Sequence, residues 1–393
     1  MRLAIISHKI CWKDEKSPTG YATDGGFPRQ VEAISELFDE TKLVVPLKED
    51  EIKSGLSPLL GKRIRLEKLS VLKGASVKRK LLFPFWLMQN ANVIWREVKH
   101  ADAVHTPIPG EIGTIGLVFA MMQKKPLFVR HCGNWLVQRT TAEKFWKWLM
   151  EKFAGGRNLM LATGGAINAP SRKNPNIKWI FSTSLRSREI AGAKHHSLPQ
   201  NGKLKLLIAC RQEPRKGTEI LIKSLPLILE KFPNAKLDVI GDGSLLGSFK
   251  DLAKDLNVKD KINFHGKIEH KKVIELMKQA HVFCFPTSAS EGFPKVVLEA
   301  LACGLPIVTT KVSVLPQLIG TENGIILDEV TSENLAKAVS AICSSSEIYE
   351  QNSMNAIATA QQYSLENWRD FIGENMRKTW NVSALSHTFC NES

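Results

Sequence analysis

The sequence predicts an α/β protein built from two Rossmann-like, doubly wound domains in tandem. Three observations lead to this fold class. The chain has 393 residues, two to three times a typical domain size of about 150 residues. Short apolar segments of strand length alternate with helical stretches along the chain, as in βαβ units. Residues 193–203 have the composition of a linker and separate the two halves.

The first half contains apolar segments that read as buried parallel strands, several of which end at a polar residue. These strands are predicted over residues 3–7, 43–45, 103–105, 127–130 and 179–182, with helices near 27–40, 110–123 and 141–154. We assign residues 1–195 to this N-terminal domain.

The alternation is clearer in the second half. Strands are predicted over residues 204–209, 236–241, 262–264, 282–285 and 306–309, with helices near 217–231, 244–256 and 269–279 and others starting near 294 and 332. The stretch 347–383 is also helical. We assign residues 196–365 to a C-terminal domain and expect residues 366–393 to return to the N-terminal one. A ligand is expected in the cleft between the domains, at the carboxyl ends of the strands.

Composition excludes several classes of protein. Hydrophobic residues make up 43% and charged residues 24%, which is typical of a globular chain rather than a disordered one. No run of about 18 apolar residues is present, so the sequence predicts no transmembrane helix. The seven cysteines are scattered without a CxxC pair, so neither a disulfide framework nor a zinc site is expected. We expect a soluble, cytoplasmic protein.

Positive charge is concentrated in the first half. Residues 1–195 hold 32 Lys and Arg against 17 Asp and Glu, whereas residues 196–393 hold 22 of each. Residues 52–99 alone carry 11 basic side chains and two acidic ones, and within them three cations at 78–80 adjoin an apolar, aromatic cluster at 81–88. Such a segment suits the surface of an anionic membrane.

Two other interpretations of this segment stay open. The same charge would suit a nucleic acid or an anionic substrate, although no nucleic-acid-binding motif accompanies it, and we expect no nucleic-acid partner. Alternatively, the segment is a solvated helical face whose apolar residues lie in the core: Phe83, Phe85, Trp86 and Leu87.

The most specific stretch lies at residues 291–299. Glu291 and Glu299 stand eight positions apart across a predicted loop-to-helix junction. The backbone N–H groups between them point out of a helix N-terminus, which binds anions. Carboxylates at the margins of such a site are placed to accept hydrogen bonds from sugar hydroxyls. Gly292 allows a close approach of the backbone, and Pro294 suits a first helical position.

These residues resemble the retaining GT-B glycosyltransferases marked by E-x7-E (glycosyltransferase family 4, group 1). A companion motif agrees, because Arg211 ends a strand and is followed five residues later by Lys216 and Gly217. The resemblance implies that Arg211 and Lys216 hold the diphosphate of a nucleotide sugar and stabilise the charge on the leaving phosphate.

Weaker matches extend the resemblance over nearly the whole chain. The glycine turn at Gly241 resembles the one that follows the second strand of the donor domain, and Lys267 and Ile268 resemble the segment that reads the nucleotide base. In the first half, Gly25 and Gly26 resemble the N-terminal glycine loop. His131 resembles the sugar-contacting histidine, with Arg130 and Asn134 as alternatives for that role. The implied catalytic residues are His131, Arg211, Lys216 and Glu291. The implied donor-binding residues are Gly25, Gly26, Gly241, Lys267, Ile268, Gly292, Phe293, Pro294, Lys295, Val296 and Glu299.

The resemblance implies a transferase that moves a sugar from a UDP-sugar, with glucose as the expected sugar, to an acceptor with retention at the anomeric carbon. The acceptor is expected to be a saccharide or a lipid-linked saccharide in bacterial polysaccharide assembly. The leaving phosphate takes the acceptor proton on the face it departs from, while Glu291 holds the sugar. No Asp-x-Asp occurs in the sequence, so no metal and no cofactor are expected.

Two alternatives remain. One is a nucleotide-sugar epimerase or hydrolase on the same fold, for which no spacing marks a catalytic carboxylate. The other is a basic protein that binds membranes or polyanions and retains a vestigial nucleotide-sugar site. Peripheral contact with an anionic membrane is compatible with both this alternative and the transferase.

Overall fold

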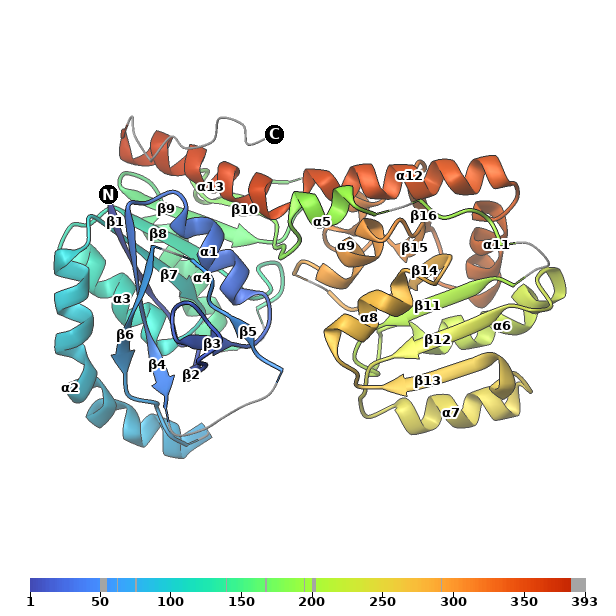
Figure 1. Cartoon of the computed structure of the whole chain (residues 1–393), viewed down its shortest axis with the longest axis horizontal. Helices are drawn as coiled ribbons and strands as arrows, with labels where there is room; N and C mark the ends of the chain where they lie inside the picture. Colours follow the sequence, from blue (N-terminus) through green and yellow to red (C-terminus); the bar gives the residue numbers. More distant parts are fainter. Residues whose placement is uncertain are drawn as a thin grey trace. The chain divides into compact units, whose positions relative to one another are not determined.

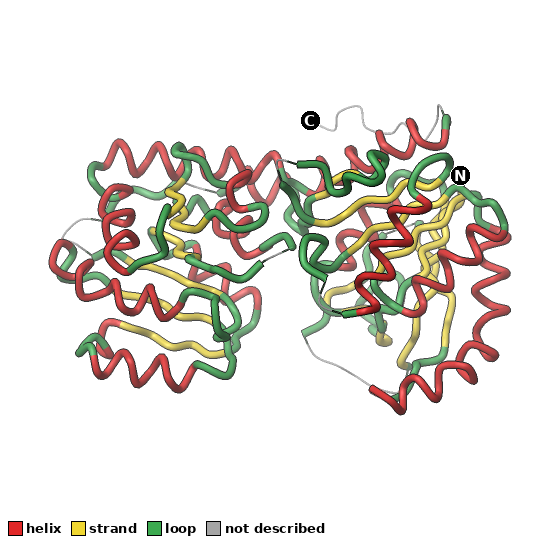
Figure 2. The backbone as a smooth tube through the Cα atoms, turned by 180° about the vertical axis from the view of Figure 1, so that it is seen from behind, coloured by secondary structure: helices red, strands yellow, loops and turns green. Residues whose placement is uncertain are grey.

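The structure, a computed structural model, describes residues 1–49, 55–61, 63–74, 76–138, 140–166, 168–193, 195–199, 203–290 and 292–382. The chain divides into two compact units (Figure 1). The first consists of Met1–Thr163, Asn168–Ser184 and Leu365–Ser393, and the second of Gly164–Ile167 and Leu185–Ser364. Each unit has its own sheet, mainly parallel in the first unit and wholly parallel in the second, with helices on both faces, as Figure 2 shows in yellow and red.

A ten-stranded sheet, counted over the described residues, organises the first unit. Its strands are β1 (Arg2–Ile6), β2 (Cys11–Lys13), β3 (Tyr21–Thr23), β4 (Glu40–Lys48), β5 (Ser57–Pro58), β6 (Ile64–Leu69), β7 (Ala103–Ile108), β8 (Leu127–His131), β9 (Asn158–Thr163) and β10 (Lys178–Ile180). The order is β10-β9-β8-β7-β1-β4-β2-β3-β5, with β6 also paired to β4. β3 runs antiparallel to β2 and β5, whereas the other pairs are parallel.

Alternate residues of β1 enter two different cores, as the period of a strand requires. Leu3 and Ile5 pack under α1 (Phe27–Ser35) and α13 (Leu365–Trp380). Ile6 packs on the opposite face, under α2 (Ser76–His100), α3 (Glu111–Met122) and α4 (Thr141–Phe153). A strand that is buried on both faces is apolar throughout, and for this reason β1 reads as a continuous hydrophobic run.

The second unit contains a six-stranded sheet within the described residues, and all of its pairs are parallel. Its strands are β11 (Lys205–Ala209), β12 (Lys236–Ile240), β13 (Ile262–Gly266), β14 (Val282–Phe285), β15 (Ile307–Thr310) and β16 (Gly324–Leu327). The order β13-β12-β11-β14-β15-β16 is the doubly wound order 3-2-1-4-5-6 of Rossmann folds.

Helices cover both faces of this second sheet as well. One core contains apolar residues of α6 (Thr218–Lys231), α7 (Leu246–Asp255) and α11 (Ser332–Ile342). The other contains residues of α5 (Ser187–Ala191), α8 (His270–Met277), α9 (Lys295–Ala302), α10 (Leu315–Leu318) and α12 (Ser346–Gln362). A short 3-10 helix, η2 (Lys259–Lys261), leads into β13.

Side-chain caps fix the start of several helices. Thr140 and Glu143 form a reciprocal capping box at α4, in which each side chain accepts a hydrogen bond from the backbone N–H of the other residue. Thr331 caps α11 and Ser345 caps α12 with one hydrogen bond each, in which the side-chain hydroxyl accepts from a backbone N–H of the first turn. These helices therefore begin where the sequence places a hydroxyl before an apolar pattern.

The structure confirms the predicted fold class and most of the predicted elements. Four strands of the first unit, β2, β3, β5 and β6, were not predicted, and neither were β9 and β16. The predicted domain boundary at 195/196 differs from the division at 184/185. The reason is that α5 packs on α12, and the Gln361 side-chain amide donates to the carbonyl of Ser187. No helix in the described part of the chain is long and apolar enough to cross a membrane.

Candidate functional site

The candidate site lies at the carboxyl edge of the sheet in the second unit. The chain reverses its progress across the sheet between β11 and β14, and in open α/β sheets the loops at such a point diverge and leave room for a ligand. The loop after β11 carries Arg211 and Lys216, and the loop after β14 leads into α9. This is the part of the second unit where an anionic ligand is expected.

The loop after β11 places two cations at this edge. Arg211 follows the strand closely and its side chain is exposed. Lys216 precedes Gly217, which has a φ of +92° and is the N-cap of α6. A Cβ at Gly217 would stand 2.6 Å from the carbonyl carbon of Pro286, so only glycine fits the turn. The turn holds Lys216 at the N-terminus of α6, next to the loop after β14.

Arg215 fastens the two loops to each other. Its backbone has a φ of +70°, and its carbonyl oxygen accepts hydrogen bonds from the N–H of Ser288 and the hydroxyl of Thr287 at 2.9 and 3.1 Å. Its guanidinium donates back to the carbonyl of Ser288 at 2.6 Å. A left-handed backbone is costly for a side-chain-bearing residue and persists only when its surroundings fix it. The bonds with residues 287–288 supply that constraint.

Gln212 is fully buried beneath Arg211 and joins three elements. Its side-chain amide donates to the carbonyls of Cys210 and Ile240 at 3.0 Å each. Its side-chain oxygen accepts a hydrogen bond from the hydroxyl of Thr218, the first residue of α6, at 2.7 Å. One side chain thus ties the end of β11, the end of β12 and the start of α6 together, and it sets the loop from which Arg211 projects.

The glycine turn after β12 packs directly on this loop. Gly241 has a φ of +113°, and a Cβ there would overlap the carbonyl oxygen of Cys210 and stand 2.9 Å from its carbon. A Cβ at Gly243 would crowd the backbone of Gln212 in the same way. The structure therefore gives Gly241 a packing role beside the Arg211 loop. Asp242 accepts a hydrogen bond from the N–H of Gly243 and does not cap α7, whose N-cap is Leu245.

Glu299 is the carboxylate that the described structure places at the site. It is the fifth residue of α9 and only 9% exposed. The ring Nε2 of His270, the first residue of α8, lies 3.0 Å from Glu299 Oε1. Glu291 lies outside the described residues. Pro294 was expected at the first helical position, but it is the N-cap and α9 begins at Lys295.

Residues after β13 and at the start of α9 lie on the same apolar cluster. Ile268, Phe293 and Val296 are partly buried against it, and the Phe293 ring lies 6.0 Å from that of Tyr363. Gly266, with a φ of +62°, turns the chain towards Lys267, which is exposed. Ile268, predicted to read the base, and Phe293 and Val296, predicted to bind the donor, thus pack against one apolar cluster.

A histidine and a carboxylate are also paired on β12 and β13. Asp238 is buried, and His265 Nε2 lies 2.7 Å from its Oδ1. Asn263 donates to the same oxygen at 3.1 Å. This pair fixes the end of β13, from which residues 267–268 continue.

The other predicted site residues belong to the first unit. Gly25 has a φ of +72°, and Gly26 is the N-cap of α1. His131 ends β8 and is buried, with its ring packed edge-on against Trp135 at 5.2 Å. Burial lowers the pKa of His131 to about 4, so its ring is neutral at physiological pH. Its Nδ1 has no hydrogen-bond partner among the described residues.

The two alternatives to His131 have different surroundings. Arg130 points to the opposite face of the sheet, where it donates to Gln30 at 2.9 Å and lies over the ring of Trp368 at 5.2 Å. Asn134 accepts hydrogen bonds from the N–H groups of Leu136 and Val137 and so shapes its own turn. Among the described residues, His131 Nδ1 and two buried nitrogens of Arg130, Nε and Nη1, have no hydrogen-bond partner. His131 is the one of the three residues that ends the strand β8.

Comparison with known proteins shows which proteins this chain is similar to. Residues 193–359 match the family of glycosyl transferases group 1. This segment, most of the second unit, is therefore similar to group 1 glycosyltransferases. An uncharacterized glycosyltransferase of Haemophilus influenzae is 28% identical over 342 residues, which cover 86% of this chain and 84% of that protein. A GDP-mannose-dependent monoacylated alpha-(1-6)-phosphatidylinositol monomannoside mannosyltransferase of Corynebacterium glutamicum is 30% identical over 139 residues, 33% of this chain and 36% of that one.

Solved structures show the same fold over nearly the whole chain. Anabaena Alr3699/HepE, crystallised in complex with UDP, superposes with a TM-score of 0.69 at 17% identity over 96% of this chain and 100% of that one. WaaG, a glycosyltransferase involved in lipopolysaccharide biosynthesis, gives a TM-score of 0.61 at 15% identity over 96% and 99%. The fold is GT-B, as the resemblance predicted.

Sequence reasoning missed three residues that build the candidate site. Gln212, Arg215 and His270 all position other groups through contacts between segments distant in sequence. Gln212 and Arg215 lie between Arg211 and Gly217, and their position within that motif was the signal that could have identified them. His270 had none, because its partner Glu299 is 29 positions away.

No group of three or more His, Cys, Asp or Glu side chains that could hold a metal ion occurs among the described residues. Arg211, Lys216 and the backbone N–H groups at the start of α9 are the candidate groups for an anionic ligand at this edge of the second sheet.

Proposed function

We propose that the chain is a retaining glycosyltransferase that transfers a sugar, with glucose as the first candidate, from a UDP-sugar to a saccharide or lipid-linked acceptor, as in bacterial polysaccharide assembly. The observation that carries the proposal is the placement of Arg211, Lys216 and the buried Glu299 around the switch point of the second sheet. The complexes of the structural neighbour Alr3699/HepE with UDP and with UDP-glucose support a UDP-sugar as the donor.

The two cations suit the diphosphate of the donor. An arginine at the end of the first strand and a lysine at the N-terminus of the following helix form a positively charged corner on a loop that Gln212 and Arg215 hold in place. Fixed donors that need no reorganisation stabilise charge that develops on a leaving group. We propose that they replace a metal ion in neutralising the leaving UDP.

Glu299 suits the ribose of the nucleotide. A buried carboxylate oriented by His270 keeps a second oxygen available to accept hydrogen bonds from two vicinal hydroxyls. Ile268 and Phe293 offer an apolar surface to the base. Lys295 and Val296, at the start of α9, present backbone N–H groups and one further cation to the phosphates.

Transfer with retention needs little acid–base chemistry from the protein in this proposal. The departing phosphate oxygen accepts the proton of the attacking hydroxyl, which arrives on the same face of the sugar, and Glu291 holds the sugar. Most of the rate enhancement then comes from charge stabilisation by Arg211 and Lys216 and from positioning. His131 stays neutral because of its lowered pKa and contributes hydrogen bonds to the sugar rather than a proton.

Peripheral contact with an anionic membrane is part of the proposal. On α2, Leu81, Phe85 and Met88 are 69, 67 and 77% exposed and recur at helical spacing on one side. Lys78 and Lys80 are exposed at the start of the same helix. An exposed apolar stripe that begins with cations is typical of helices that lie in a membrane interface.

Calorimetric titration with a panel of nucleotides and nucleotide sugars, in EDTA, tests the donor site. We expect UDP and UDP-glucose to bind, and the Arg211→Ala, Lys216→Ala and Glu299→Gln variants to bind them about 10- to 100-fold more weakly, since a hydrogen bond to a charged group contributes about 1.5–3 kcal/mol. Lys250→Ala, an exposed lysine on α7, is the matched control and should bind as the wild type does. Binding of UDP that requires a divalent cation would refute the metal-free arrangement, and absence of nucleotide binding would refute the donor site.

Proton NMR of the released sugar tests the stereochemistry. With UDP-glucose and water as the acceptor, retention gives α-glucose first, before mutarotation. Initial formation of β-glucose would refute a retaining reaction. Formation of an epimerised nucleotide sugar would identify the protein as the alternative epimerase.

A further inference from the structure

Three helices, α2, α3 and α4, lie side by side on one face of the sheet in the first unit, and their inner sides share one core. Neighbouring helices also touch each other directly. The ring of Trp95 on α2 packs edge-on against that of Phe119 on α3 at 5.1 Å. The indole N–H of Trp146 on α4 donates to the hydroxyl of Thr114 on α3 at 2.9 Å. α3 is therefore the middle helix of a continuous layer, the α2–α4 layer.

The middle helix carries apolar side chains on its outer side as well as on its inner side. Its 12 residues include a single charged side chain, that of Glu111. Leu117 is buried, whereas Val118 and Met122, one turn apart, are 42 and 64% exposed. A surface helix normally turns a polar side to water, and a helix that is apolar all round is normally covered. The outer side of α3 has no such cover among the described residues.

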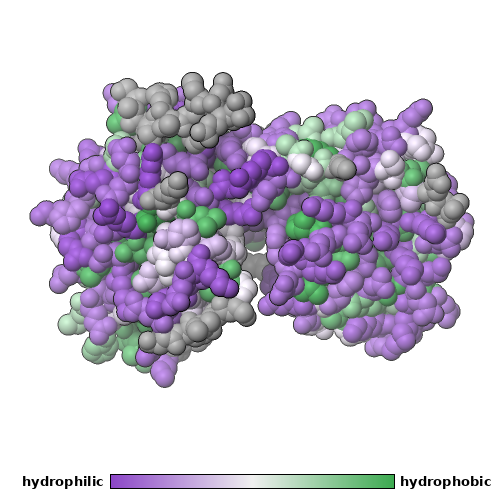
Figure 3. Space-filling view, viewed as in Figure 1, coloured by the Kyte–Doolittle hydropathy of each residue, from purple (hydrophilic) through white to green (hydrophobic). Residues whose placement is uncertain are grey.

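The outer sides of α2 and α4 continue this apolar surface. Phe85 and Met88 on α2 are exposed, as are Phe145 and Trp148 on α4, whose rings lie 5.9 Å apart. Counted over the described residues, ten of the fourteen exposed large hydrophobic side chains belong to these three helices or to the loop that leads into α4. Figure 3 shows hydrophobic side chains on the surface at the lower left, where Figure 1 draws α2. The exposed apolar side chains are thus concentrated on one layer of one unit.

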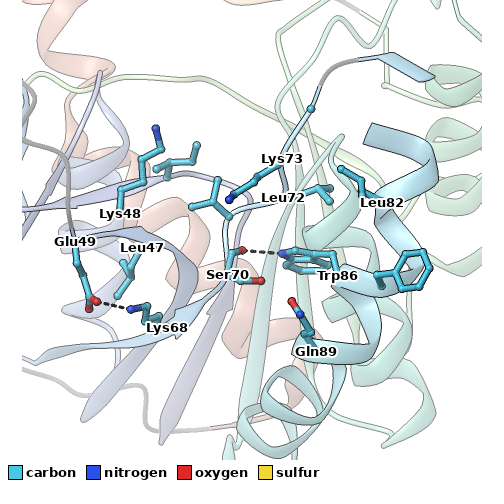
Figure 4. Close-up of a pocket in the computed structure, with 14 residues that line it drawn as sticks. Leu47, Lys48, Glu49, Lys68, Ser70, Leu72, Lys73, Leu82, Trp86 and Gln89 are labelled. Atoms are coloured by element: carbon cyan, nitrogen blue, oxygen red, sulfur yellow. Dashed lines mark hydrogen bonds and ion pairs between the residues drawn. The ribbon is translucent and has the colours of Figure 1, made fainter. Parts of the chain in front are cut away.

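Buried hydrogen bonds hold α2 in its rotation within this layer. The indole N–H of Trp86 donates to the carbonyl of Ser70 at 2.7 Å, and Figure 4 shows the ring pointing at that residue. Asn90, one turn further along, accepts from the N–H of Ser70 and donates to its hydroxyl at 2.9 and 2.8 Å. Because Trp86 and Asn90 are fixed on the inner side, Phe85 and Met88 must point outward. The apolar surface is therefore a built feature of the fold.

Cations lie on the two helices that flank α3. The three helices together hold eight Lys and Arg against four Glu. Lys78, Lys80 and Lys99 on α2 and Lys144 on α4 are exposed, and none of these four forms an ion pair among the described residues. Each of the four carboxylates has a local partner: Glu97 pairs with Arg96, Glu111 with Arg79, Glu143 accepts from the N–H of Thr140, and Glu151 accepts from the hydroxyl of Ser171. The layer thus has an uncharged middle helix between two cationic ones.

This pattern suits an anionic lipid bilayer better than other partners. A symmetric dimer would pair the face with itself and bring the cations of two copies together. A nucleic acid would satisfy the cations and leave the apolar side chains in water. A bilayer offers acyl chains to α3 and anionic headgroups to the lysines. The ammonium of Lys152 lies 5.1 Å from the centre of the Trp148 ring, and tryptophan and lysine are residues that anchor proteins at a membrane interface.

We propose that the α2–α4 layer is the face with which the chain binds an anionic lipid bilayer, with the outer side of α3 and the ring of Trp148 among the acyl chains and the lysines of α2 and α4 at the headgroups. The proposal deepens the membrane contact of α2 in the proposed function, on which it rests. It adds α3 and α4 to that contact and assigns the bilayer to one face of the first unit.

Co-sedimentation with vesicles tests this face in the full-length protein. We expect binding to phosphatidylcholine vesicles that contain about 30 mol% phosphatidylglycerol, and binding at least about tenfold weaker to phosphatidylcholine alone. Met122→Ser removes an apolar side chain from α3, and Met354→Ser, at a residue of the second unit that is 44% exposed, is the matched control. Met122→Ser should weaken vesicle binding about fivefold or more, and Met354→Ser should leave it within about twofold. Equal effects of the two substitutions would overturn the proposal.

Lipids with brominated acyl chains test how deeply the layer enters the bilayer. Trp95 and Trp148 are the tryptophans of the layer that are exposed, at 38 and 49%. Brominated vesicles should quench part of the tryptophan fluorescence of the bound wild type. Trp148→Phe keeps an aromatic ring, so its vesicle binding should stay within about threefold while the quenched part falls. Binding without quenching would show that charge alone holds the protein at the surface, and this result would overturn the proposal.

Two further measurements separate this proposal from the others. If Phe85→Ser weakens vesicle binding but Met122→Ser and Trp148→Ser do not, the α2–α4 layer fails as the binding face and the contact of α2 alone stands. All of these variants should bind UDP as the wild type does, because they lie outside the donor site, so UDP binding without vesicle binding would refute the membrane contact and leave the donor site intact. Dimers in sedimentation velocity that Met122→Ser abolishes, without vesicle binding, would assign the face to a second copy of the chain and overturn the proposal.

Discussion

Replacing Gly241 with alanine tests the packing of the glycine turn on the Arg211 loop. The new Cβ would overlap the carbonyl oxygen of Cys210, and the residue would keep a φ of +113° that L residues rarely adopt. The turn has little freedom to withdraw, because the N–H of Gly241 donates to Gly266 at 2.8 Å and the N–H of Gln212 donates to Asp242 at 3.0 Å. We therefore expect both the strain and the overlap to destabilise the second unit.

The magnitude follows from these two effects. A left-handed backbone costs an L residue about 1–2 kcal/mol, and overpacking costs about 1–3 kcal/mol. The free energy of unfolding of the second unit should therefore fall by about 2–5 kcal/mol. For a unit of this size, 1 kcal/mol shifts the melting temperature by about 2–4 °C, so a decrease of about 4–20 °C is expected.

Spectroscopy can read the two units separately. All nine tryptophans lie in the first unit, so tryptophan fluorescence follows that unit and far-UV circular dichroism follows both. In Gly241→Ala the circular dichroism transition should fall while the fluorescence transition stays in place. UDP affinity should fall as well, because the displaced loop carries Arg211.

Gly247→Ala is the matched control. Gly247 lies in α7, and a Cβ there would have nothing within 4 Å. Because alanine is a better helix former than glycine by up to about 1 kcal/mol, this variant should melt at or slightly above the wild-type temperature. If Gly241→Ala melts within about 2 °C of the wild type, the close approach of the two backbones is wrong.

Three further predictions concern other contacts. In Gln212→Leu, the carbonyl of Cys210 loses its donor and the hydroxyl of Thr218 loses its acceptor, whereas the carbonyl of Ile240 keeps the N–H of Cys210. The free energy of unfolding of the second unit should fall by about 2–4 kcal/mol; an unchanged circular dichroism transition would contradict this. In His270→Ala, Glu299 loses its orienting partner, and the Kd for UDP should rise about three- to tenfold, whereas the exposed neighbour variant Lys271→Ala should leave it unchanged; equal effects would exclude a positioning role. Burial lowers the pKa of His105 to about 3 and that of His131 to about 4. As the pH falls, these histidines are therefore protonated in the unfolded chain before they are protonated in the folded protein. The stability of the first unit should therefore fall between pH 6.5 and pH 5 by up to about 2 kcal/mol for each histidine, measured by urea unfolding with tryptophan fluorescence; a flat profile would mean that these rings are not buried in neutral form.

The alternation of short apolar runs was sufficient to predict the fold class, but not every strand. β9, with the sequence Asn-Leu-Met-Leu-Ala-Thr, contains no β-branched residue before its last position, so it resembles a helical segment as much as a strand. β16 has only four residues and begins with glycine. Pairing with β8 and β15 makes them strands, and such pairing is not visible in local sequence.

The basic segment shows why helix phase limits sequence reasoning. Pro84 lies inside α2, although proline usually ends a helix. Phe85 and Trp86 are neighbours in sequence, yet one is 67% and the other 4% exposed. Trp86 is the buried one because its N–H reaches the carbonyl of Ser70. Neither the core interpretation nor the surface interpretation of the aromatic cluster was therefore correct for all of its members.

The residues of the candidate site also differ in how far the sequence alone predicts them. Arg211, Lys216 and Glu299 could be predicted as site residues because their spacing along the chain carries the signal. The side chains of Gln212 and Arg215 donate to carbonyl groups of other segments, those of Ile240 and Ser288, and any polar side chain in the motif would have looked equivalent. Which of them reaches such a carbonyl depends on how the loops pack after folding.

The return of the chain to the first unit has a consequence for its synthesis. α13 contributes Trp368, Ile372 and Met376 to the core beside α1, and Arg369 is paired with Glu36. Burial of three such side chains contributes roughly 5–9 kcal/mol, which is comparable to the whole stability of a typical domain. During synthesis, the first unit therefore lacks part of its core until α13 has been made. The second unit is complete in the nascent chain before the first, although its residues are made later.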